Sequence, residues 1–312
     1  MPTSTAEEES KDEMLNLIHK RKIEYYSSLS PPRTIKKSTV KQQLTKVRNI
    51  YKNMIGGDKF NFTFLKKKDK VIKYINNKYK TAESKNANIQ AIASILQVMP
   101  ELKKEYDYYS KYSTEARQDI TKDNQKNLTT DKEKENLISW PEILELTNKD
   151  MDSLSKAIVS IYTLIPPRRA QAIGDLVIGD KENMNSLILN KNNIGTYIVF
   201  RDYKTAKTYG DQKFRIPRKL GLILRDYIEE YELKNGDVLF QTKAGTPYKN
   251  FSEIVSNVFK AQTGKKLTVN LLRHSYVSNL LKSNPSKEEL NTASEKLAHS
   301  LFKLLDYNRV DL

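Results

Sequence analysis

The stretch from residue 115 to residue 136, EARQDITKDNQKNLTTDKEKEN, contains almost no apolar side chains. Such a segment cannot drive burial, so one continuous hydrophobic core cannot run through the chain. The 312 residues are enough for two ordinary domains, one on each side of it. We therefore expect four parts: a flexible N-terminal segment over 1–35, a first domain over 36–115, a linker or exposed helix end over 116–136, and a second domain over 137–312.

The first domain is predicted to be helical and basic. Apolar residues recur at spacings of three and four, as at Val40, Leu44 and Val47, which is the pattern of an amphipathic helix. Lysines lie between these apolar residues and are densest over residues 66–80. Single lysines usually lie on solvated helix faces, but this density favours a face that follows a phosphate backbone. The lysines that we select as DNA contacts are Lys66, Lys67, Lys68 and Lys73.

The chain carries a formal net charge of +16, from 54 Lys and Arg against 38 Asp and Glu. A surplus of this size favours a polyanionic partner, and nucleic acid comes first because neutralised phosphates release counterions. A membrane surface comes second, but the sequence has no run of ~18 apolar residues and no secretory signal. We therefore expect an intracellular protein, located wherever its target DNA lies, that is neither secreted nor bound to a membrane.

The chain has no cysteine and only three histidines, His19, His274 and His299. Disulfides, thiolate metal sites and a cysteine nucleophile are therefore excluded. A three-histidine metal site would need His19, which lies in a charged N-terminal segment. We expect neither a metal site nor a cofactor.

The second domain is predicted to alternate between helices and strands. Residues 187–190 and 196–203 have the pattern of strands, residues 204–212 that of a polar turn, and residues 213–217 that of a returning partner strand. Helices are expected over 151–165, 218–232, 250–262 and 268–283. The predicted fold class is mainly α with a small antiparallel β-sheet.

Three segments of this domain carry residues that suit phosphodiester cleavage without a metal. That reaction needs a nucleophile, cations on the non-bridging oxygens and an acid for the leaving oxygen. Arginine suits the cationic role because its planar fork makes two parallel bonds to phosphate and keeps its charge. Two arginines, a lysine, a histidine and a tyrosine from distant segments would supply the whole set.

Two motifs make this pattern specific. Leu272-Arg273-His274-Ser275-Tyr276 resembles the Leu-Arg-His-Ser-Phe signature of tyrosine recombinases and integrases, and Leu297-Ala298-His299-Ser300 resembles the Leu-Gly-His-Ser segment that follows it. The nucleophilic tyrosine of that family comes shortly after this histidine. Tyr307 is the only tyrosine after His299, eight residues on (307 − 299 = 8).

The first arginine and the lysine of the family are less directly assigned. The family's first arginine is followed by apolar positions four and seven residues on and an acid eleven on, which fits Arg169 better than Arg168. The family's lysine lies on a β-hairpin, and the matching turn here runs over residues 204–210. We favour Lys207 over Lys204 because it lies closer to the returning strand, and Lys204 stays open as the alternative.

The resemblance implies a two-domain, C-shaped clamp around double-stranded DNA, with self-association into a tetramer on that DNA. Tyr307 would attack the scissile phosphate to form a 3′-phosphotyrosine link, and Arg169 and Arg273 would hold the non-bridging oxygens. Lys207 would protonate the leaving 5′-oxygen, and His299 would orient the phosphate or assist proton transfer. The covalent link conserves energy, so neither metal nor cofactor is needed. The Lys- and Asn-rich sequence is similar to recombinases of large DNA viruses and virophages.

Two departures from the family pattern keep other functions open. Asn270 stands where the family usually has a histidine, and only five residues follow Tyr307, where many relatives dock a longer tail on a neighbour. Asn270 can still contact phosphate, as can His274 and Lys204, so these three join the DNA-contact candidates. The alternatives are a type IB topoisomerase, whose relatives also lack that histidine, and a DNA-binding protein that has lost catalysis.

Overall fold

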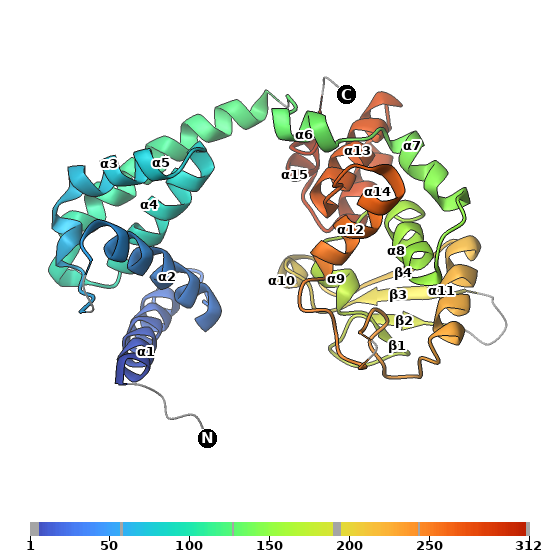
Figure 1. The fold of residues 1–312 in the computed structure, drawn as a ribbon, viewed down its shortest axis with the longest axis horizontal. Coiled ribbons are helices and arrows are strands. Elements are labelled where there is room, and N and C mark those ends of the chain that lie inside the picture. Colours follow the sequence, from blue (N-terminus) through green and yellow to red (C-terminus); the bar gives the residue numbers. More distant parts are fainter. Residues whose placement is uncertain (1–5, 57–58, 127, 190–194, 243, 310–312) are drawn as a thin grey trace. The chain divides into compact units, whose positions relative to one another are not determined.

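The computed structural model describes residues 6–56, 59–126, 128–189, 195–242 and 244–309 (Figure 1). The chain forms two compact units, Met1–Gln125 and Lys126–Leu312. Each unit has its own hydrophobic core. Among the described residues, no helix is both long enough and apolar enough to cross a membrane.

The first unit is a bundle of α-helices. Its helices are α1 (Ala6–Ser27), α2 (Lys37–Met54), α3 (Lys68–Lys78), α4 (Ala82–Leu96) and α5 (Lys103–Gln125), with short 3-10 helices at Thr63–Lys66 and Pro100–Leu102. The stripe of Val40, Leu44 and Val47 is fully buried in the core, as its spacing predicts. Helix α4 begins at an N-cap, where the Thr81 hydroxyl accepts a hydrogen bond from the Ser84 amide.

The N-terminal segment differs from the flexible region expected over 1–35. Helix α1 occupies most of it, and Leu15 and Ile18 on that helix are buried in the core of the first unit. These two apolar residues, three positions apart, lie on the same face of the helix. The acidic residues that precede Leu15 led us to expect a flexible segment rather than this helix.

The second unit combines helices with one small sheet. Its helices are α6 (Asp131–Asn136), α7 (Trp140–Glu145), α8 (Ser153–Thr163), α9 (Ala170–Gly174), α10 (Ala206–Tyr209), α11 (Arg218–Glu230), α12 (Phe251–Thr263), α13 (Val269–Lys282), α14 (Lys287–Lys296) and α15 (Leu301–Leu305), with a 3-10 turn at Leu146–Asn148. Helix α6, at the start of the unit, lies within the stretch expected to be a linker or helix end. The predicted class, mainly α with a small sheet, is confirmed.

The sheet has four strands in the order β1 (Val177–Ile178), β2 (Ser186–Ile188), β3 (Tyr197–Phe200) and β4 (Gln212–Arg215). The predicted hairpin is β3–β4, which pairs antiparallel from Tyr197↔Arg215 to Phe200↔Gln212. Strands β2 and β3 also pair antiparallel, whereas β1 and β2 are parallel, so the sheet is mixed rather than wholly antiparallel. Strand β1 has only two residues, too short for period-two alternation to show in the sequence.

The β3–β4 hairpin and two apolar clusters position the segments that carry the candidate site residues. Helix α10 forms within the predicted polar turn, and both α9 and α10 lie at one end of the sheet (Figure 1). The main core joins the sheet to α8, α11 and α12. A separate small cluster contains Val277, Ala293, Leu297, Leu304 and Tyr307, so the proposed nucleophile belongs to an apolar group of α13, α14 and α15.

Candidate active site

Arg273 lies at the centre of the second unit and is completely buried. It projects from α13, which begins at an N-cap where the Thr268 hydroxyl accepts from the Leu271 amide. The guanidinium donates from Nη1 to the Pro167 carbonyl at 2.7 Å and from Nη2 to the Leu297 carbonyl at 3.2 Å. These bonds place Arg273 beside both other segments that the sequence motifs identified.

Among the described residues, no carboxylate pairs with Arg273, and its Nε is buried without a hydrogen-bond partner. Burial lowers the pKa of Arg273, while the charge of Tyr307 and a hydrogen bond to it act against that shift. A buried guanidinium with an unsatisfied donor is costly unless an anion completes its contacts. The arrangement therefore suits an incoming phosphate oxygen.

Arg169 and His299 meet although 130 residues separate them. Arg169 is the N-cap residue of α9, and its Nη2 lies 3.5 Å from Nδ1 of His299. His299 is 4% exposed, and its Nε2 is buried without a partner among the described residues. Burial and then the charges of Arg273 and Arg169 lower the pKa of His299 to about 3. The imidazole is therefore neutral at pH 7.

Tyr307 follows α15 and lies against both groups. Its ring centroid is 5.3 Å from that of His299, and the Arg273 Cζ is 4.8 Å from the Tyr307 ring, a cation–π distance. The side chain is 9% exposed. The structure thus brings together four of the five residues predicted to carry catalysis: Arg169, Arg273, His299 and Tyr307.

His274, selected from the sequence as a DNA contact, lies beside Tyr307, with the two ring centroids 5.1 Å apart. It is buried, and its Nδ1 is 2.8 Å from the backbone carbonyl of Tyr307. Burial and the charge of Arg309 lower its pKa to about 4, so the neutral ring donates its Nδ1 proton to that carbonyl at pH 7. Its Nε2 faces Arg309 and Glu133, which pair with each other at 2.9 Å. The structure therefore gives His274 a supporting position rather than an exposed one.

The two candidate lysines differ in position. Lys204 is exposed and lines a small cavity together with Arg169, Gln171, Leu297 and Ala298. Lys207, the residue favoured from the sequence, is exposed on α10 and is not part of the described lining of this cavity. The turn itself is attached to the site, because the Thr205 hydroxyl donates to the Ala298 carbonyl at 3.0 Å. Lys204 and Arg169 therefore line the same cavity.

Arg168 has a role that the sequence did not show. It is 3% exposed and lies over the rings of Phe200, Tyr203 and Phe214, with its Cζ 4.3 Å from the nearest of the three ring centroids. Burial lowers its pKa to about 9. Arg168 therefore packs the hairpin against the start of α9 and adds positive charge near His299. The sequence has two adjacent arginines here, and nothing in it indicates which of them is buried.

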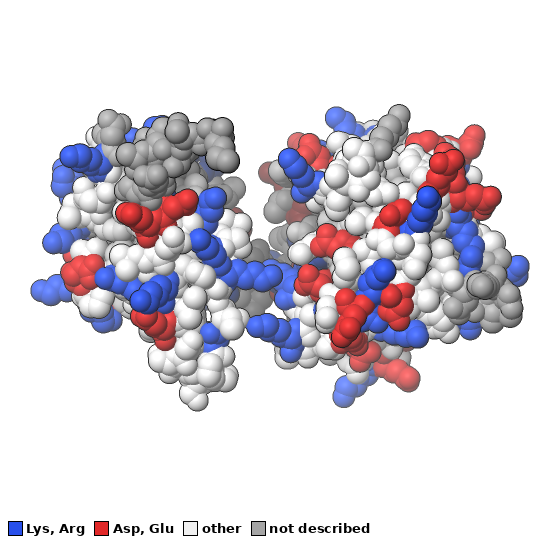
Figure 2. Space-filling view, turned by 90° about the horizontal axis from the view of Figure 1, so that it is seen from below, with Lys and Arg blue, Asp and Glu red and all other residues white. Residues whose placement is uncertain are grey.

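The remaining DNA-contact candidates lie on the surface. Asn270 is exposed on the first turn of α13. Lys66 and Lys67 are exposed just before α3, and Lys73 is exposed in the middle of that helix. Lys68, the first residue of α3, is half-buried with its Nζ 5.1 Å from the Tyr108 ring centroid. On the face drawn in Figure 2, Lys and Arg side chains are interspersed with Asp and Glu on both units.

The first unit also has a polar groove that the sequence analysis missed. The groove has a volume of about 620 Å³, and residues of α1, α2, α4 and α5 line it. Its polar lining includes Gln42, Gln43, Lys46, Gln90, Gln97 and Arg117. Beneath it, the Nζ of fully buried Lys22 donates to the Ser94 hydroxyl, and that hydroxyl donates to Gln43. The recurrence of Gln on facing helices is the signal that would have found it.

The described residues also bear on whether the protein could hold a metal ion. Within the described part of the chain, no group of three or more His, Cys, Asp or Glu side chains is placed to hold a metal ion. The groups around Arg273 are instead cationic or neutral: two further arginines and a neutral histidine. Such a set attracts an anion and repels a cation.

Comparison with known proteins finds similar structures but no similar sequences. No family model matches the sequence, and no curated protein sequence matches it. A fragment of the Tn1549 transposon integrase, solved in complex with transposon right-end DNA, is 13% identical over 94% of each chain, with a TM-score of 0.56. The XerA recombinase is 14% identical over 94% of this chain and 93% of its own, with a TM-score of 0.39. The XerH site-specific recombinase bound to difH is 16% identical over 94% and 91%, with a TM-score of 0.42.

Of these three structures, we use the Tn1549 integrase to assign the fold, because its TM-score of 0.56 corresponds to a shared fold. The match covers nearly all of this chain, so both units take part in it. The resemblance drawn from the Leu-Arg-His-Ser and Leu-Ala-His-Ser motifs is thereby confirmed at the level of architecture. The chain has the tyrosine recombinase fold of that integrase.

Proposed function

We propose that this protein is a site-specific DNA recombinase or integrase that cuts and rejoins strands through a covalent bond between Tyr307 and a 3′-phosphate. The observation that carries the proposal is the meeting of Arg169, Arg273, His299 and Tyr307 from three distant segments. A packing role alone would not require two arginines and a neutral histidine around one phenol. Cations and a proton acceptor around a nucleophile are what phosphoryl transfer requires.

The proposed reaction starts with the Tyr307 phenol. Its proton passes to His299, directly or through water, once the negative charge of the bound phosphate offsets the arginine charges that help to lower the His299 pKa. The phenolate oxygen then attacks phosphorus, and the bond from phosphorus to the 5′-oxygen breaks. Arg169 and Arg273 stabilise the charge that develops on the non-bridging oxygens. A lysine of the 204–210 turn gives a proton to the leaving 5′-oxygen. Rejoining reverses these steps, with a 5′-hydroxyl of the same or a partner duplex as nucleophile.

In the free protein Tyr307 packs beneath Arg273 in the apolar cluster of α13–α15. We propose that phosphate binding displaces the Arg273 guanidinium from the ring and turns the phenol toward the phosphorus. The unsatisfied Nε of Arg273 and Nε2 of His299 support this step, because each would gain a partner. Catalytic contacts of free enzymes are often long and tighten only when the substrate binds.

For the first unit we propose double-stranded DNA contacts through two surfaces. The lysines at 66–73 supply charge to the phosphate backbone, and the polar groove carries Gln and Arg side chains that can bond to base edges. The net charge of +16 supports such a partner. In this proposal both units bind the same duplex.

The proposal is tested by covalent selection from a library of duplexes that carry a random 40-bp core with one fixed nick. A nick lets a short cleaved fragment leave, so the covalent intermediate accumulates. The wild-type chain should yield protein–DNA adducts that survive detergent, and sequencing them identifies the preferred site. A label at the 5′ end of the cut strand should stay with the protein, because the link is to a 3′-phosphate.

The matched variants are Tyr307→Phe, which should form no adduct, and Tyr276→Phe, which removes a neighbouring phenol and should form it normally. An adduct with Tyr307→Phe would refute the assigned nucleophile. Failure of the wild-type chain to yield any adduct would refute the cleavage function and favour a DNA-binding role. Relaxation of supercoiled plasmid of any sequence by a monomer would favour a topoisomerase.

A further inference from the structure

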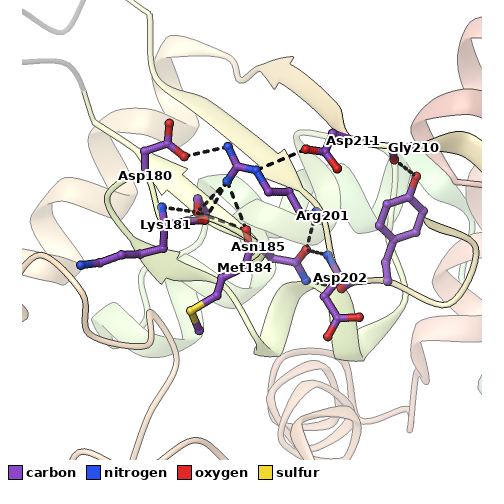
Figure 3. Close-up of polar contacts among 10 residues, drawn as sticks. Asp180, Lys181, Met184, Asn185, Arg201, Asp202, Gly210 and Asp211 are labelled. Atoms are coloured by element: carbon purple, nitrogen blue, oxygen red, sulfur yellow. Dashed lines mark hydrogen bonds and ion pairs between the residues drawn. The ribbon is translucent and has the colours of Figure 1, made fainter. Parts of the chain in front are cut away.

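Asn185 is a buried amide whose four hydrogen bonds all go to the backbone. Figure 3 shows its bonds to Arg201 and Asp202. It immediately precedes strand β2 and is 1% exposed. Its Oδ1 accepts from the amides of Arg201 and Asp202, at 2.9 and 3.0 Å. Its Nδ2 donates to the carbonyls of Asp202 at 2.7 Å and Ala172 at 3.3 Å.

These bonds hold two segments that the sheet itself does not hold. The β3–β4 ladder ends at the pair Phe200↔Gln212, so Arg201 and Asp202 lie just beyond it. Ala172 lies on α9, the helix that Arg169 caps. One side chain therefore fixes the Arg169 helix and the start of the 204–210 turn at a set separation.

Arg201 reinforces the same turn from its outer side (Figure 3). Its Nη2 contacts Asp180 at 2.8 Å, its Nε lies 3.4 Å from Asp211, and its Nη1 donates to the carbonyls of Lys181 and Met184. Asp211 stands at the far end of the turn, so Arg201 joins both ends of it. Both aspartates are more than half exposed, so these ion pairs contribute less than the buried amide.

Two more contacts complete the attachment of the turn. The Tyr203 hydroxyl donates to the Gly210 carbonyl at 2.7 Å and closes the turn on itself (Figure 3). The Thr205 hydroxyl donates to the Ala298 carbonyl, directly before His299. Lys204 lies between these two anchored residues and lines the cavity beside Arg169. Its backbone is therefore held on both sides.

We propose that Asn185 is a positioning residue that sets the distance between the Arg169 phosphate clamp and the lysine that protonates the leaving 5′-oxygen. This role rests on the proposed function, and it assigns that lysine as Lys204. Asn185 touches neither DNA nor the reacting atoms. It acts through the backbone at Ala172 and Asp202, and a shift of about 1 Å in such an arrangement can cost about 100-fold in rate.

The test uses the duplex recovered by covalent selection, made with either oxygen or sulfur as the 5′-bridging atom at the scissile phosphate. A thiolate leaves without being protonated, so a defect in the acid disappears with the sulfur substrate. Asn185→Ala should slow cleavage of the oxygen substrate by about 10- to 100-fold, against less than about threefold for the sulfur substrate. Lys204→Ala should show the same pattern. That pattern in Lys207→Ala, with Lys204→Ala slowing both substrates equally, would overturn the assignment of the lysine as Lys204.

The control is Leu224→Ala, which removes a buried side chain of α11 in the core away from the turn and should affect both substrates equally. If Asn185→Ala does not fold, Arg201→Met replaces it, because Arg201 holds the turn from its partly exposed side. This variant should slow cleavage of the oxygen substrate more than that of the sulfur substrate, by a smaller factor than Asn185→Ala. Equal slowing of both substrates by the Asn185 and Arg201 variants would overturn the positioning role. Absence of wild-type cleavage on either substrate would instead overturn the proposed function itself.

Discussion

The two buried histidines of the second unit make its stability depend on pH in a defined window. Folding lowers the pKa of His299 to about 3 and that of His274 to about 4, mainly through burial. An ordinary histidine has a pKa of about 6.5, so between these values the unfolded chain binds protons that the folded chain does not. Stability is therefore complete above pH 6.5 and is lost as the pH falls through that window.

The size of the effect follows from proton linkage. Each such group changes the free energy of unfolding by about 1.4 kcal/mol for each pH unit below its unfolded pKa. From pH 7 to pH 5 each histidine should therefore cost about 2 kcal/mol, and the two together about 4 kcal/mol. This is a large part of the 5–15 kcal/mol by which domains of ordinary stability resist unfolding.

Urea unfolding followed by Trp140 fluorescence measures this loss. Trp140 is the only tryptophan of the chain and is buried in the second unit, so its signal reports on that unit. Between pH 5 and 6, above the range where carboxylates titrate, the slope of unfolding free energy against pH should correspond to the uptake of about two protons on unfolding. His299→Gln and His274→Gln should each remove about one proton from the slope. An unchanged slope in both variants would refute the assignment of the two depressed pKa values.

Other perturbations test the site and its support. Arg273→Ala should reduce the rate of adduct formation by about 100- to 1000-fold, as for the loss of a group that stabilises a transition-state oxyanion, and a full-rate variant would remove Arg273 from the clamp. DNA affinity measured by fluorescence anisotropy should fall steeply between 50 and 200 mM salt, and a flat response would contradict phosphate contacts. Gly174→Ala should lower the midpoint of urea unfolding by the Trp140 signal, because its Cβ would lie 2.9 Å from the Phe251 side chain; an unchanged midpoint would show that the phenyl ring moves aside.

The sequence was most informative where local patterns coincide with tertiary ones. The stripe of Val40, Leu44 and Val47 predicted a buried helix face, and residues 196–203 with 213–217 predicted the hairpin that became β3 and β4. Arg169 meets His299, while Arg168 is enclosed by aromatic rings, and the preference for Arg169 as the phosphate contact stays a prediction.

Features that depend on contacts between distant segments were not predictable. Nothing near Asn185 in the sequence announces that its amide will bond Ala172 and Asp202, because those partners are set by the packing of α9 against the turn. His274 belongs to a sequence motif, yet its burial depends on Glu133 and Arg309 from either end of the unit. The polar groove escaped notice because four separate helices form it.

The two backbone bonds of Arg273 bear on how the chain is made. Its guanidinium reaches back 106 residues to Pro167 and forward 24 residues to Leu297, so the clamp exists only once all three segments have folded together. A chain still emerging from the ribosome, or one shortened by a protease, would present arginines without the phenol that follows them. Under the proposed function, a partial chain that lacks Tyr307 would therefore be unable to cut DNA.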